Sequence, residues 1–240
     1  MSGRLEGRTA TSAGDAAILR PVQAREQKGM AGGKRSVVVF DLGGVLIDWN
    51  PRYLYRKLFA GDETAMEHFL ATVCTQHWNE QMDAGLAFAE ACAPLLASHP
   101  ERAAEILAWG QRFAEMMDAP IHGTVEILDE LHDAGVPLYA LTNWSAETFP
   151  HARRRFDFLD RFRGIVVSGH EGMIKPDPRL YRLLLDRHAI AASDAVYVDD
   201  NPTNAATATG LGLHGIHFTG PEALRGELRR VGLLDAKAPA

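Results

Sequence analysis

The sequence predicts an α/β fold, a doubly wound parallel sheet with a block of helices inserted after the first strand. Three observations carry this prediction. Short apolar runs alternate with helical segments over the second half of the 240-residue chain. Residues 51–120 show helical periodicity without a strand signal. Three of the apolar runs end on polar residues that can do chemistry, namely Asp41, Thr142 and the pair Asp199-Asp200.

Residues 1–35 differ in character from the remainder of the chain. They are rich in Gly, Ala, Arg, Gln and Ser, and they keep no amphipathic period. Such a segment cannot bury enough apolar surface to fold, so we expect a disordered N-terminal arm. The apolar stretch 16–19 is too short for the core of a signal peptide. Met30 is a candidate for the true start of the protein.

The first strand is predicted over Val37–Phe40, and it ends on Asp41 before the glycines Gly43 and Gly44. A carboxylate at the end of a buried strand loses hydration, and this loss is costly unless the charge meets a metal ion or a substrate. Asp41 is therefore a candidate functional residue on the sequence pattern alone.

The inserted block reads as consecutive helices. Asn50 can cap the first helix, and Pro51 suits its first position. Asp62 can cap the second, and further helices are expected over Phe88–Leu96 and Pro100–Met117. We expect this block to form a separate helical cap.

The remaining chain alternates between helices and strands. Helices are expected over 125–135, 180–188, 204–210 and 221–231, and strands over 136–141, 164–168, 195–198 and 215–218. This alternation implies right-handed crossovers and a parallel sheet, whose ligand site lies at the carboxyl ends of the strands. The predicted organisation is a core of residues 36–50 and 121–240 with a cap of residues 51–120 over that edge.

Composition excludes several classes of function. A net charge of -6 gives no general attraction for nucleic acid or anionic membranes, and no segment approaches a membrane span. Cys74 and Cys92 are too few for a disulfide framework and have no metal-site spacing, so we expect reduced thiols and a cytoplasmic location. The expected state is a monomer or a homodimer.

Four short segments with the character of sequence motifs follow one another along the chain. They are VVVFDLGGVL at 37–46, YALTN at 139–143, GMIKPDP around Lys175 and VYVDDNPTNA at 196–205. Together they resemble the haloacid dehalogenase (HAD) superfamily, in its subfamily I with a helical cap and a phosphatase-like DLGGV first motif. The resemblance runs from Ser36 to about Val231, and it implies a Rossmann-like core and a hydrolase, most often a phosphatase.

The resemblance also implies roles for individual residues. Asp41 would be the nucleophile that forms an aspartyl-phosphate, which divides a slow hydrolysis into two easier steps. Thr142 would donate its hydroxyl to the phosphate, and Asn143 its backbone N–H. Lys175 would neutralise the nucleophile and the phosphate.

Mg²⁺ is the implied cofactor, because a carboxylate approaches a phosphate dianion only when their repulsion is offset. The implied ligands are Asp41, the backbone carbonyl of Gly43 and Asp200, with Asp199 as a further ligand or acid. Asn204 stands where many relatives carry another carboxylate.

Gly43 departs from the family pattern, since most family phosphatases carry an aspartate there as general acid. Loss of such an acid costs ~10²–10⁴ in rate unless it is replaced. The candidate substitutes are His77 or Asp83 in the cap, Asp48, or a substrate whose leaving group needs little protonation, such as an anomeric sugar phosphate.

We therefore expect a Mg²⁺-dependent phosphatase that hydrolyses a small phosphomonoester, with sugar phosphates as one class. The first alternative is a 2-haloacid dehalogenase-type hydrolase, for which Asn201 is a partial match, although the acidic pair 199–200 favours phosphate. The second is a catalytically weakened binding protein, supported only by Gly43. Five cap-side residues stay open as substrate contacts or core residues: His68, His77, Trp78, Trp109 and His122.

Overall fold

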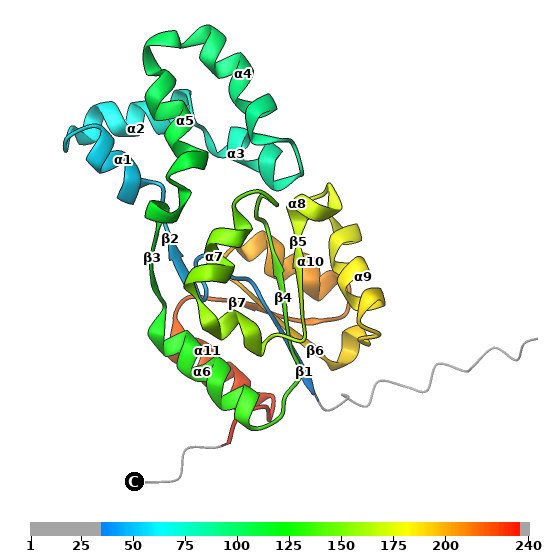
Figure 1. Ribbon diagram of the computed structural model, residues 1–240. Coiled ribbons are helices and arrows are strands. Elements are labelled where there is room, and N and C mark those ends of the chain that lie inside the picture. Colours follow the sequence, from blue (N-terminus) through cyan, green and yellow to red (C-terminus); the bar gives the residue numbers. More distant parts are fainter. Residues whose placement is uncertain (1–34, 236–240) are drawn as a thin grey trace, which may run out of the picture. The chain divides into compact units, whose positions relative to one another are not determined.

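A computed structural model describes residues 35–235 of the chain (Figure 1). The prediction of a disordered arm, including the question of whether Met30 is the start, concerns residues that lie outside this range except for Arg35. Among the described residues, no helix is both long and apolar enough to cross a lipid bilayer.

A five-stranded parallel sheet forms the centre of the molecule, in the order β5-β4-β1-β6-β7. The strands are β1 (Val37–Phe40), β4 (Leu138–Thr142), β5 (Gly164–Val167), β6 (Ala195–Asp199) and β7 (His214–His217). The predicted doubly wound parallel sheet is confirmed. Because the chain builds β4 and β5 on one side of β1 and β6 and β7 on the other, the direction of winding reverses beside β1, where such sheets bind ligands.

Helices cover both faces of this sheet (Figure 1). One face carries α6 (His122–Asp133) and α11 (Pro221–Arg230), and the other carries α9 (Pro178–Arg187) and α10 (Pro202–Gly210). Successive side chains of β1 point to opposite faces, as the two-residue period of a strand requires. Val38 and Phe40 thus pack in one apolar cluster and Val39 in the other.

Five helices make up the insert that follows β1: α1 (Arg52–Leu58), α2 (Glu63–Thr72), α3 (Gln76–Asp83), α4 (Phe88–Ser98) and α5 (Ala103–Gln111). Asp62 caps α2 as expected and accepts a hydrogen bond from the backbone N–H of Ala65 at 3.0 Å. Trp109 is at the centre of the packing, with ring centroids 5.3 Å from Trp78 and 5.9 Å from Tyr55.

Two short strands correct the expectation of an all-helical insert. β2 (Ile47–Trp49) pairs antiparallel with β3 (Met117–Pro120), so the helix expected to reach Met117 ends at Gln111 and is followed by a 3₁₀ turn. This two-stranded β2–β3 ribbon joins the helical insert to the core (Figure 1). Neither strand has a strong sequence pattern typical of a β-strand. Each forms by pairing with a partner about 70 residues away in the chain, and local sequence does not reveal this pairing. The helices α7 (Phe149–Arg155) and α8 (Ser168–Glu171) were also not expected.

The close approach of β7 and α10 gives a test of the fold. A Cβ atom added at Gly215 would lie 2.2 Å from the backbone oxygen of Ala205, so Gly215→Ala must push the helix off the sheet. We expect the free energy of unfolding to fall by about 1–3 kcal/mol. Gly226→Ala is the control, because nothing lies within 4 Å of its added Cβ and alanine favours the helix α11 by up to ~1 kcal/mol. Urea unfolding of both variants measures the difference, and equal effects would contradict this packing.

Candidate active site

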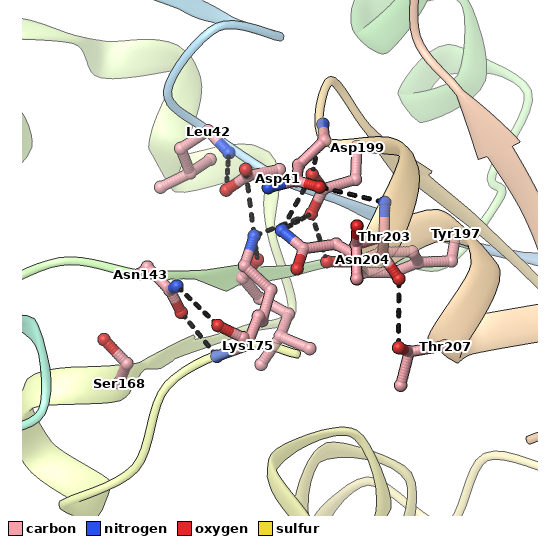
Figure 2. Close-up of polar contacts among 12 residues, drawn as sticks. Asp41, Leu42, Asn143, Ser168, Lys175, Tyr197, Asp199, Thr203, Asn204 and Thr207 are labelled. Carbon is pink, nitrogen blue, oxygen red and sulfur yellow. Dashed lines mark hydrogen bonds and ion pairs between the residues drawn. The ribbon is translucent and has the colours of Figure 1, made fainter. Parts of the chain in front are cut away.

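The polar residues at the carboxyl ends of β1, β4 and β6 meet in one cavity of about 370 Å³. Asp41 directly follows β1, Thr142 is the last residue of β4, and Asp199 is the last residue of β6. Lys175 reaches them from the loop between α8 and α9 (Figure 2). The structure thus brings together residues that lie more than a hundred positions apart in the sequence.

Lys175 lies between two carboxylates. Its Nζ is 2.9 Å from Asp41 Oδ2 and 2.8 Å from Asp199 Oδ2, and it donates a hydrogen bond to the backbone oxygen of Leu141 at 3.1 Å. Its side chain is 1% exposed. Asn143 fixes its backbone, because Oδ1 accepts from the N–H of Lys175 at 2.8 Å and Nδ2 donates to its carbonyl at 3.1 Å. The Asn143 side chain therefore positions Lys175.

Asp199 is fully buried, and its two oxygens are surrounded by donors. Besides Lys175, it accepts hydrogen bonds from the Tyr197 hydroxyl at 2.6 Å, the backbone N–H of Asn201 at 2.9 Å and the Asn204 amide at 3.1 and 3.2 Å (Figure 2). A carboxylate with so many partners is fixed in place. Asp200 differs, since it lines the cavity and is exposed.

Burial dominates the electrostatics of the cluster. It raises the pKa of Asp41 to about 7, against the opposing charge of Lys175. Asp200 is partly desolvated although it reaches the surface, and this desolvation raises its pKa, with the charge of Asp199 as the second cause. For Lys175, burial acts to lower the pKa, but the charges of Asp41 and Asp199 outweigh it and raise the pKa above its usual value.

The donor set fits a hard divalent cation. Oxygens of Asp41, Asp199 and Asp200 lie within 4.8 Å of one another. When all three are ionised and Lys175 is charged, the cluster carries a net charge of about -2, which a divalent cation would balance. Gly44 makes room for the outer carboxylate: it has a φ of +70°, and a Cβ there would lie 2.4 Å from Asp200 Oδ2.

The inserted helices complete the wall of the cavity. Gln76, Asn79 and Asp83 of α3 face it with polar groups. Three aromatic residues also line it: Trp49, Phe113 and Trp144. The cavity therefore has a charged end at the sheet and a wall of mixed polarity beside the insert.

The five residues left open as substrate contacts are not part of this wall. Trp78 and Trp109 pack against each other, and Trp78 Nε1 donates to the backbone oxygen of Ala91 at 2.8 Å. The side chain of His77 is 84% exposed, His68 lines a separate groove on the insert, and His122 begins α6. The structure therefore favours a place in the core or on the surface for these residues, and not a contact with the substrate.

Two contributors, Tyr197 and Asn79, were missed although the sequence carried a signal for each. Tyr197 precedes Asp199 by two residues in a strand, so both side chains point to the same face. Asn79 and Asp83 are four residues apart in α3, a spacing that places both on one side of a helix. Thr142, which is expected to bind phosphate, lines the cavity.

Known proteins with similar sequences and structures show the family of this chain. Residues 36–212 match the family described as haloacid dehalogenase-like hydrolase. The sesquiterpene phosphatase astK of Aspergillus oryzae is 30% identical over 193 residues, which cover 80% of this chain and 94% of that protein.

Two solved structures share the fold. A HAD family enzyme of Bacteroides thetaiotaomicron, in its magnesium complex, has a TM-score of 0.63 at 18% identity and covers 82% of this chain and 99% of its own. The L-2-haloacid dehalogenase of Xanthobacter autotrophicus has a TM-score of 0.57 at 19% identity, with 84% and 85% covered. Since the family match spans most of the sequence, the chain belongs to the haloacid dehalogenase-like hydrolases and is a hydrolase.

Proposed function

We propose that the protein is a Mg²⁺-dependent phosphatase that hydrolyses a small phosphomonoester through an aspartyl-phosphate at Asp41. The observation that carries this proposal is the buried ammonium of Lys175 between Asp41 and Asp199, beside the acidic Asp200. The similarity to a sesquiterpene phosphatase over nearly its whole length supports the same class of reaction.

In the proposed reaction, Asp41 attacks the phosphorus and the bond to the ester oxygen breaks. Water then attacks the same phosphorus and releases Asp41. Lys175 holds positive charge next to Asp41, where negative charge collects during transfer. Thr142 offers its hydroxyl to a phosphate oxygen, whereas the Asn143 side chain is occupied by Lys175 and leaves only its backbone N–H for that task.

Asp41, the backbone carbonyl of Gly43 and Asp200 would hold the Mg²⁺. When bound, the ion supplies positive charge that offsets the repulsion between a carboxylate and a phosphate dianion. Asp199 suits a different task, because its oxygens already accept hydrogen bonds from Tyr197, Asn201 and Asn204. It fixes Lys175 and the loop that carries Asp200.

The wall of the cavity indicates what kind of organic group is accepted. Aromatic surface from Trp49, Phe113 and Trp144 would contact apolar carbon or the face of a sugar ring. Gln76 and Asn79 offer hydrogen bonds to hydroxyls. Sugar phosphates and phosphorylated terpenoids are therefore the two substrate classes to compare first. The cytoplasmic location and the monomeric or dimeric state stay predictions.

The dehalogenase alternative rests on a shared fold with the Xanthobacter autotrophicus enzyme. The charge of the cluster argues against a dehalogenase that works without a metal ion, because a 2-haloacid carries its own carboxylate and would meet the excess negative charge of Asp41, Asp199 and Asp200. In the phosphatase, the bound Mg²⁺ would offset this charge. The binding-protein alternative, which rests on Gly43, is weakened by the intact pairing of Asp41 with Lys175.

The role of Asp41 gives the first functional prediction. Asp41→Asn should abolish phosphate release while the protein stays folded, since the substitution removes the nucleophile at nearly constant shape. The melting temperature should fall, because Lys175 loses one of its two buried carboxylate partners. Phosphate release at saturating substrate and Mg²⁺, measured beside thermal unfolding, checks this. Substantial residual turnover would remove Asp41 from the mechanism.

The two neighbouring aspartates should differ in their effect on metal dependence. Asp200→Asn should raise the Mg²⁺ concentration needed for half-maximal activity by at least about tenfold, because it removes a direct ligand. Asp199→Asn should instead lower stability, because it disturbs the buried partners of Lys175. Two measurements on both variants test this: titration of activity with Mg²⁺, and urea unfolding. If Asp199→Asn needs more Mg²⁺ for half-maximal activity than Asp200→Asn does, the ligand assignment is wrong.

Chelation separates the phosphatase from the dehalogenase. EDTA should stop phosphate release, and added Mg²⁺ should restore it. Assays with 2-haloacids in the same buffers should show no halide release. Halide release that persists in EDTA would favour the dehalogenase.

A further inference from the structure

Hydrolysis of an alkyl phosphate needs a proton donor. The departing alkoxide is strongly basic, so the phosphorus–oxygen bond breaks slowly unless the ester oxygen gains a proton as it leaves. This inference rests on the proposed phosphatase function. Gly43 has no side chain to donate, and a Cβ atom placed there would meet nothing within 4 Å, so the space beside Asp41 is open.

Four side chains with acid–base chemistry line the cavity in the described part of the chain: Asp41, Asp83, Lys175 and Asp200. Asp41, Lys175 and Asp200 belong to the charge cluster at the sheet. Asp83 comes from α3, on the insert side of the cavity. The other sequence candidates stand elsewhere, since His77 is exposed and Asp48 accepts a hydrogen bond from the Tyr53 hydroxyl at 2.8 Å.

We propose that Asp83 donates the proton to the leaving ester oxygen and later takes a proton from the attacking water. Asp83 would then be a catalytic residue supplied by the inserted helices, while the nucleophile comes from the core.

The surroundings of Asp83 hold it in place for this task. Its carboxylate accepts a hydrogen bond from Asn79 Nδ2 at 2.8 Å and another from the backbone N–H of Ser145. Its backbone oxygen accepts from Ser168 Oγ at 2.6 Å, and the same hydroxyl accepts from the backbone N–H of Trp144 at 2.9 Å. The loop after β4 therefore fixes Asp83 close to the strand end that carries the proposed phosphate-binding residues.

The protonation of Asp83 suits a donor at neutral pH. It is 6% exposed, and burial raises its pKa to about 7, with the charge of Glu80 as a further raising cause. The hydrogen bonds from Ser145 and Asn79 and the charge of Lys175 act in the opposite direction. A carboxyl group with a pKa near 7 is protonated in a large fraction of the molecules at neutral pH, and it can return to that state after each turnover.

The atoms balance over two steps. In the first, Asp41 forms a bond to phosphorus, the ester bond breaks, and the oxygen that leaves takes the proton of Asp83 to give an alcohol. In the second, water attacks the phosphorus of the aspartyl-phosphate and gives a proton to Asp83. The bond to Asp41 breaks, and inorganic phosphate leaves with both residues restored.

The test compares leaving groups in the natural protein and in Asp83→Asn. The probes are p-nitrophenyl, phenyl and a primary alkyl phosphate with Mg²⁺ present. In the natural protein, kcat/KM should depend weakly on leaving-group pKa. In Asp83→Asn it should fall ~10²–10⁴-fold for the alkyl phosphate and little for p-nitrophenyl phosphate. A burst of p-nitrophenol followed by slow turnover is also expected, because the second step has lost its base.

Two further variants serve as controls. His77→Ala, in the same helix, should leave all three rates unchanged. Gly43→Asp combined with Asp83→Asn should recover part of the alkyl phosphate rate, because the open space at Gly43 accepts a new donor. Asp83→Asn should keep its melting temperature, because the side-chain amide of Asn79 can reverse and accept a hydrogen bond from the introduced amide.

An equal loss for all three substrates would show a merely structural role and overturn the inference, as would no loss at all. If Asp83→Asn does not fold, the natural protein and Gly43→Asp are compared instead. A steep dependence of kcat/KM on leaving-group pKa in the natural protein, made weaker by Gly43→Asp, overturns the inference. A weak dependence that Gly43→Asp leaves unchanged supports it. Absence of phosphate release from every substrate would instead overturn the proposed function.

Discussion

The site depends on one interaction, the buried ammonium of Lys175 shared between Asp41 and Asp199. Burying any of these charges alone would cost several kcal/mol, and removing one partner of a buried ion pair typically costs about 3–5 kcal/mol. The three residues come from different parts of the chain, and the parallel sheet brings their backbones to one edge. Fold and site are therefore linked, because the sheet order determines which charges meet.

The cluster has more negative than positive charge, and this imbalance gives the site its chemistry. Asp199 is saturated by hydrogen bonds and acts as an anchor, whereas Asp41 and Asp200 line the cavity. A site of this kind has room for added positive charge and for an anionic substrate that arrives with it. The inserted helices close the other side, where Asp83 provides a further buried carboxyl group that lies outside the charge cluster.

Much of this could be predicted from the sequence, for reasons that particular residues show. Asp41, Thr142 and Asp199 each end an apolar run, and parallel strands place such ends together. Local signals also sufficed for Asp62 as a helix cap. The β2–β3 ribbon could not be predicted in this way, because each strand is defined by a partner far along the chain.

The wall of the cavity was harder to predict than the charge cluster. Trp78 and Trp109 are of a residue type that often contacts ligands, but they pack against each other inside the insert. The aromatic residues that line the cavity are Trp49, Phe113 and Trp144. Only the path of the insert relative to the sheet separates these two groups, and no local pattern encodes it. Asp83 was one of several candidates for the same reason, until burial and the contacts with Asn79 and Ser145 set it apart.

The central claim is that Asp41 carries the phosphoryl group between the two steps. The most direct measurement is to mix the protein with Mg²⁺ and a phosphomonoester radiolabelled in its phosphoryl group, quench in acid, and locate the label by peptide mapping. The account predicts label on the peptide that contains Asp41, lost on treatment with hydroxylamine as an acyl phosphate would be. Release of labelled phosphate with no label on that peptide, or stable label on another residue, would contradict it.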